Sequence, residues 1–119
     1  MSVPEPVGAV GELWWHVHHD ILAENLTEPA SVRRAYILTT KPEAEVALRL
    51  ALMQPVRSKA VRDASAACQA AYNAYQVAYP PSGAYRALLD ADAALDAALD
   101  AAHDVECPDC PWDGLTIFP

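Results

Sequence analysis

Apolar residues recur at the helical period in five successive segments of the chain. The first segment runs from about Gly11 to Leu26. Its apolar positions recur about once per helical turn: Val10, Leu13 with Trp14, Val17 and Ile21. In a helix of 3.6 residues per turn, this spacing gathers them on one side. The other side would carry Glu12, His16, His19 and Asp20. The pattern predicts a first amphipathic helix.

A second helix is predicted over about 28–39. Thr27 can cap it, with Pro29 in its first turn, where a missing N–H costs nothing. We expect four residues on its buried side: Val32, Ala35, Tyr36 and Thr39. Arg33 and Arg34 are then expected to face solvent.

A third helix is predicted to run from the segment Thr40-Lys-Pro-Glu43 through Gln54. The Thr and Glu have the spacing of a capping box. Further along, Glu45 and Arg49 are four residues apart, in the order that favours an ion pair on a helix surface. Pro55 ends the segment.

The second half of the chain predicts a long antiparallel helical hairpin. Its helices cover about 57–79 and 84–104, joined at Pro80-Pro81-Ser82-Gly83, where Ser82 is a candidate cap. Of the 24 alanines, 16 lie between Ala51 and Ala98. Alanine has the highest helix propensity and lets helix backbones approach closely.

These elements predict an all-α fold, a small bundle of about five helices. We expect a flexible N-terminal arm over residues 1–10, a bundle over 11–104 and an irregular tail over 105–119. At 119 residues the chain is long enough to bury the core of one domain.

The charge balance narrows the classes of partner. The net charge is −8, and the eight Lys and Arg residues are scattered. Nucleic-acid phosphates attract clustered cations, so no direct nucleic-acid binding is expected. No apolar run is long enough to span a bilayer, and a secretory signal pattern is missing, so we expect a cytoplasmic protein.

The segment His103-x3-Cys107-Pro-Asp-Cys110 is the clearest chemical signal. A Cys-x-x-Cys turn directs two sulfurs to one point, and many zinc sites hold half of their metal in this way. His103 is a candidate third ligand. The candidates for a fourth are His16, His19, Asp20 and Asp104. One such pair is a half-site, so two alternatives stay open: a redox dithiol and two reduced thiols in a tail.

Two further groups of polar residues suggest functions of other classes. A carboxylate and two imidazoles on the predicted first helix could serve a metal-dependent hydrolase, with the residues Glu12, His16, His19 and Asp20. They could equally be a solvated helix face.

The last predicted helix carries aspartates at steps of four: Asp92, Asp96, Asp100 and Asp104. Like charges at this spacing repel one another, which is consistent with a protein partner that has a basic surface, or with self-association. The simpler interpretation is a solvated face. No complete catalytic set is present, so the sequence favours a non-enzymatic interaction or regulatory module, such as an accessory protein of the kind phages encode. A zinc-stabilised helical domain is the main alternative.

Overall fold

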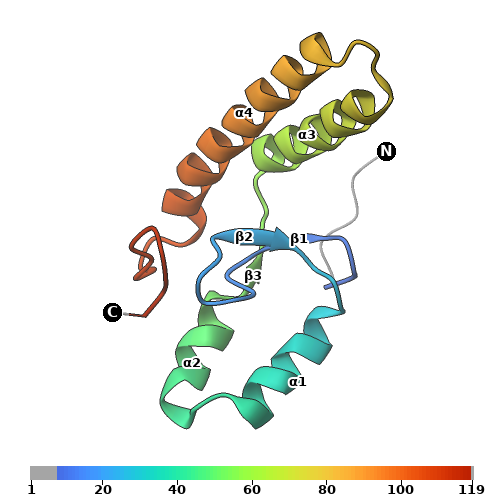
Figure 1. Ribbon diagram of the computed structural model, residues 1–119. Coiled ribbons are helices and arrows are strands. Elements are labelled where there is room, and N and C mark those ends of the chain that lie inside the picture. Colours follow the sequence, from blue (N-terminus) through green and yellow to red (C-terminus); the bar gives the residue numbers. More distant parts are fainter. Residues whose placement is uncertain (1–7, 119) are drawn as a thin grey trace. The chain divides into compact units, whose positions relative to one another are not determined.

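The computed structural model describes residues 8–118 (Figure 1). They divide into two compact units, one formed by residues 8–56 with 109–118 and the other by residues 57–108. Seven of the ten residues of the predicted N-terminal arm lie outside the described part.

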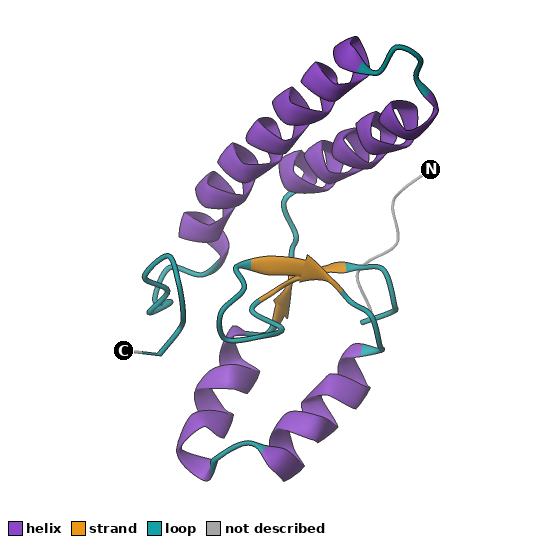
Figure 2. Cartoon of the chain, in the orientation of Figure 1, coloured by secondary structure: helices purple, strands orange, loops and turns teal. Residues whose placement is uncertain are grey.

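The predicted all-α fold with five helices is wrong. The described residues contain four helices and a small antiparallel sheet of three strands, so the fold is α+β (Figure 2). The segment predicted as the first helix forms a hairpin of β1 (Leu13–Trp15) and β2 (Ala23–Asn25). The short strand β3 (Gln54–Pro55) pairs with the other edge of β1, which gives the order β2-β1-β3.

Two adjacent tryptophans explain why a sheet forms here. Trp14 and Trp15 are both buried, although their side chains point to opposite faces of β1. A surface helix would bury only one side, whereas a strand can bury both faces when both are covered. Trp14 lies opposite Glu24 on β2 and Pro55 on β3. It belongs to a core completed by buried residues of the turns and helices: Val17, Leu26, Ala30, Ile37 and Met53.

Helices α1 (Ala30–Thr40) and α2 (Glu43–Leu52) follow the predicted second and third helices closely. Their caps differ from the prediction, because Pro29 and Pro42 occupy the N-cap positions and neither Thr27 nor Thr40 is the capping residue. The predicted pair of Glu45 and Arg49 is confirmed, at 2.7 Å.

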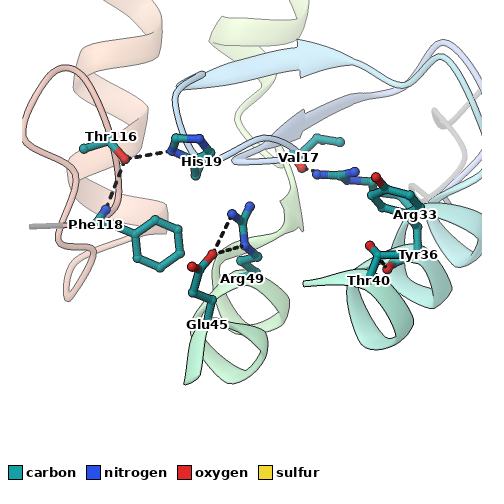
Figure 3. A network of polar contacts seen from close by, with 9 residues as sticks. All are labelled: Val17, His19, Arg33, Tyr36, Thr40, Glu45, Arg49, Thr116 and Phe118. Carbon is teal, nitrogen blue, oxygen red and sulfur yellow. Dashed lines mark hydrogen bonds and ion pairs between the residues drawn. The ribbon is translucent and has the colours of Figure 1, made fainter. Parts of the chain in front are cut away.

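The buried side of α1 is also not the predicted one. Ala30, Arg33 and Ile37 face the core, whereas Val32 and Tyr36 are about half exposed. The guanidinium of Arg33 is accommodated because its Nε donates to the Val17 carbonyl at 3.0 Å and its charge lies over the Tyr36 ring. The Val17–Arg33 bond is drawn in Figure 3.

The second unit is the predicted hairpin, built from α3 (Lys59–Val77) and α4 (Ser82–Glu106). Figure 1 shows the two helices side by side and joined at one end. The Tyr75 and Tyr85 rings meet at 5.7 Å across the hairpin. Ser82 is the first residue of α4 and Pro81 its N-cap, so the predicted Ser82 cap is wrong. None of the described helices combines the length and apolarity needed to cross a membrane.

Candidate metal centre

His16 follows β1 directly and is buried, with 2% of its surface exposed. Its backbone N–H donates to the Leu22 carbonyl at 3.0 Å, which closes the turn between β1 and β2. Its φ of 49° lies in the left-handed region, where a side chain other than glycine costs about 1–2 kcal/mol. Such a conformation persists only where the surroundings fix it, so the imidazole has a well-defined direction.

The C-terminal segment 109–118 packs in the same unit as His16. Ile117 is buried and its N–H donates to the His19 carbonyl at 2.9 Å. Thr116 Oγ1 lies 3.0 Å from His19 Nδ1, and Arg49 lies over the Phe118 ring at 5.0 Å (Figure 3). These contacts attach the segment to the loop after β1 and to α2.

The attached segment brings Cys110 to His16. Cys110 Sγ lies 3.2 Å from His16 Nε2, and the Trp112 ring lies against the imidazole with centroids 5.3 Å apart. An imidazole nitrogen and a sulfur at this distance are close enough to bind one metal ion, because zinc–nitrogen and zinc–sulfur bonds measure about 2.0–2.3 Å. The first unit therefore contains one nitrogen–sulfur pair.

The second unit contains a similar pair at the end of α4. His103 and Cys107 are four residues apart, and the Cys107 N–H donates to the His103 carbonyl at 2.9 Å, so both side chains lie on one side of the last turn. The Glu106 carboxylate fixes this end, since it accepts the N–H groups of Arg57 and Ser58 at 2.6 and 3.0 Å.

The surroundings change the pKa values of His103 and Cys68 in opposite directions. Partial burial lowers the pKa of His103, although the nearby Asp104 and Asp100 oppose that change. On α3, Cys68 donates to the Asp92 carboxylate at 2.7 Å, and this hydrogen bond raises the pKa of the Cys68 thiol. Cys68 is thereby kept as a thiol and serves as a natural control for the two other cysteines.

His16, His103, Cys107 and Cys110 are the group of candidate metal ligands, one pair in each unit. The two pairs are joined by the chain itself, because only Pro108 and Asp109 separate the cysteines. Three Cα–Cα steps span at most about 11 Å, so the cysteines stay close in any conformation. Of the residues predicted as metal ligands, His19, Asp20 and Asp104 are outside the group, and His19 Nδ1 contacts Thr116 instead.

The predicted helix face of Glu12, His16, His19 and Asp20 does not form, because the segment is a hairpin and not a helix. Glu12 has a structural position: its Oε1 accepts the Gly8 N–H at 2.8 Å and the Trp14 Nε1–H at 3.1 Å. Asp20 is exposed on the turn. The helical geometry proposed for a hydrolase is therefore absent.

The aspartates predicted to bind a partner are all on α4 and all exposed: Asp92, Asp96, Asp100 and Asp104. Their role in binding stays a prediction. Sequence reasoning missed the residues that hold Cys110 in place, namely Trp112, Thr116, Ile117 and Phe118. The apolar ending Leu115-Thr-Ile-Phe118 was the available signal that this segment packs against other residues.

Comparison of the chain with protein-family models, curated proteins and solved structures gave no match. We therefore infer function from the chemistry of the site.

Proposed function

We propose that the protein binds one zinc ion through His16, His103, Cys107 and Cys110, and that this ion stabilises the fold. One observation carries the proposal: Cys110, which belongs to a Cys-x-x-Cys sequence, has its sulfur 3.2 Å from Nε2 of the buried His16. A buried imidazole next to a thiol, with a second thiol three residues away, is a donor set that matches zinc.

The donor atoms favour zinc over other biological metals. Two sulfurs and two imidazole nitrogens are typical of tetrahedral structural zinc sites, whereas calcium and magnesium require oxygen ligands. Four protein ligands complete a tetrahedron and leave no position for a water or a substrate. The proposed role is therefore structural, and catalysis at the metal is not part of it.

Each pair of ligands is positioned before the metal binds. The left-handed backbone at His16 and the ring of Trp112 orient one imidazole. The last turn of α4 places His103 and Cys107 on one side. Because the ligands within each pair are already ordered, that part of the ordering cost does not reduce the affinity for the metal.

The free energy of zinc binding indicates how much such an ion contributes to the stability of the fold. Structural zinc binding in small domains has an apparent free energy of about 10–16 kcal/mol, while a domain's total stability is about 5–15 kcal/mol. Even a fraction of the binding energy would dominate the stability of a 119-residue chain.

The biological role that we propose for this domain is a non-enzymatic one, in binding a protein partner.

Cobalt substitution tests the ligand set directly. Co²⁺ bound by two thiolates in a tetrahedral site absorbs strongly in the visible and has a thiolate charge-transfer band. We expect both bands in the full-length protein, purified without a histidine tag and loaded with one equivalent of Co²⁺, and we expect zinc to displace them.

The variants follow from the geometry. His16→Asn keeps a residue that tolerates the left-handed backbone but removes the imidazole. His16→Asn, His103→Gln, Cys107→Ser and Cys110→Ser should each weaken or abolish the bands. Cys68→Ser and His19→Gln are matched controls and should leave the bands unchanged. Octahedral Co²⁺ spectra in the wild type, or loss of the bands in Cys68→Ser, would contradict the proposal.

A further inference from the structure

Helix α1 and its C-cap residue carry three cations that form no ion pair with any carboxylate of the described residues. Arg33 and Lys41 lie over the Tyr36 ring at 5.2 and 5.5 Å, and Arg34 lies over the Trp14 ring at 5.5 Å. This is unexpected in a chain with 16 acidic and only eight basic residues. Aromatic rings orient these cations but leave their charge uncompensated.

These cations border an exposed surface. Tyr36 is 47% exposed and Val32, one turn earlier, is 48% exposed. Arg33 is 6% exposed and held by the Val17 carbonyl, so it acts as a fixed positive charge beneath the ring. We call Val32, Arg33, Arg34, Tyr36 and Lys41 the α1 surface. It combines apolar area with fixed positive charge, which suits an acidic and partly apolar partner.

The chain itself presents such a partner surface on α4. Asp92, Asp96 and Asp100 are exposed, recur at steps of four and form no ion pair within the described residues. We call these three the aspartate row. Leu89, one turn before Asp92, is 49% exposed and adds apolar area.

The spacing of the charges is compatible between the two surfaces. Arg34 and Lys41 are seven residues apart, about 10 Å along a helix axis, and Asp92 and Asp100 are eight residues apart, about 12 Å. Long Arg and Lys side chains cover a difference of this size. Two helices that lie alongside each other could thus pair both cations at once.

We propose that the α1 surface of one copy of the chain docks on the aspartate row of a second copy. Each copy carries both surfaces, so the association joins identical chains. An exposed ion pair contributes little by itself, so the dimer is held by several pairs together with the apolar area, and it is sensitive to salt. Neither surface contains a ligand of the proposed zinc site, so this inference does not depend on metal binding.

Sedimentation velocity of the untagged, full-length protein measures the self-association. We expect the 12.8 kDa chain to sediment as a dimer at the upper end of a range of about 1–500 μM at low salt. Raising the salt from about 0.05 to 0.5 M should weaken the dimer about tenfold or more, because the screening length falls several-fold.

Charge reversal tests the two surfaces named here. Arg34→Glu with Lys41→Glu, and separately Asp96→Lys with Asp100→Lys, should each give a monomer. An equimolar mixture of the two doubly substituted proteins should associate again, because each α1 surface then meets an aspartate row of opposite charge on the other variant. Lys59→Glu with Arg86→Glu changes the net charge of −8 by the same amount as the first pair, but at residues that belong to neither named surface, and should leave the dimer intact.

Three outcomes would overturn the inference. One is a wild-type protein that stays monomeric at low salt over the whole concentration range. Another is a dimer that neither charge reversal affects, since it would use a different surface. The third is a mixture of the two reversed proteins that does not associate. Circular dichroism of each variant confirms that it has folded.

Discussion

The buried side chain of Ile117 gives the sharpest test of how the C-terminal segment is attached. Only 1% of its surface is exposed, and its N–H donates to the His19 carbonyl. Ile117→Ala removes three carbons, whose transfer from water alone is worth about 0.8 kcal/mol per carbon. With the cavity that remains, we expect a loss of about 2–5 kcal/mol in the free energy of unfolding.

The other contacts of the segment are weaker than this loss. The hydrogen bond between His19 and Thr116 contributes about 1 kcal/mol, and the cation–π contact of Arg49 with Phe118 about 0.5–1 kcal/mol. Ordering each residue of the segment costs about 1–2 kcal/mol of backbone entropy. We therefore expect Ile117→Ala to release residues 109–118 even where the rest of the unit stays folded.

Release of the segment should also weaken metal binding. Cys110 meets His16 only while the segment is attached, and the apparent affinity of a ligand falls in proportion to the population of the competent state. A loss of about 1.4 kcal/mol in attachment corresponds to a tenfold weaker affinity. We expect the Kd for zinc, measured by competition with a fluorescent chelator, to rise about tenfold or more.

Urea unfolding and amide exchange of Ile117 complete the assay. Ile117→Val is the matched control, with an expected loss of about 0.5–1.5 kcal/mol. If Ile117→Ala unfolds within about 0.5 kcal/mol of the wild type, or binds zinc with the same affinity, the attachment described here does not hold in solution.

Two further predictions concern the backbone. Gly8 has a φ of +87°, and a Cβ there would lie 2.8 Å from the Ala30 Cβ. Gly8→Ala should therefore lower the free energy of unfolding by about 2 kcal/mol. Adding Ala30→Gly should recover only the part of this loss that comes from the steric clash. The N–H groups of Thr116 and Leu115 lower the pKa of Asp113. The stability that the ionised Asp113 carboxylate adds to the folded segment is therefore complete above about pH 4. It is lost as the pH falls through the lower folded-state pKa. Asp113→Asn should remove that acid transition from the amide shifts of the segment, and an unchanged transition would contradict the assignment.

Sequence reasoning succeeded where local pattern and local structure agree. The helical period, alanine content and prolines placed all four observed helices within a few residues. These signals act over neighbouring residues, so no knowledge of the tertiary structure was needed. The pair of Glu45 and Arg49 was predictable for the same reason.

The hairpin of β1 and β2 was missed because it depends on contacts distant in sequence. Its strands are three residues long, too short for an alternating pattern, and β1 is completed by Pro55 about forty residues later. The apolar positions from Val10 to Ile21 fit a helical wheel equally well. Trp14 and Trp15 at adjacent positions were the signal against a surface helix.

The orientation of α1 was missed for a different reason. Buried charges are rare, so Arg33 was predicted to face solvent. Burial became acceptable only through the Val17 carbonyl and the Tyr36 ring, and neither contact can be derived from the local pattern.

The candidate metal site was predictable only in part. The Cys-x-x-Cys spacing and His103 are local, and the sequence indicated them directly. The choice between His16 and His19 depended on the hairpin and on the attachment of the last ten residues. The structure places Cys110 beside His16 and Thr116 beside His19.

Native mass spectrometry of the untagged, full-length protein tests the central claim most directly, since it reports the mass of each intact chain with its bound metal. We predict one zinc per chain in the wild type. The zinc should be lost from Cys107→Ser and from Cys110→Ser, and kept in Cys68→Ser. A wild-type protein that carries less than about one zinc per ten chains after growth and dialysis with zinc present would contradict the account.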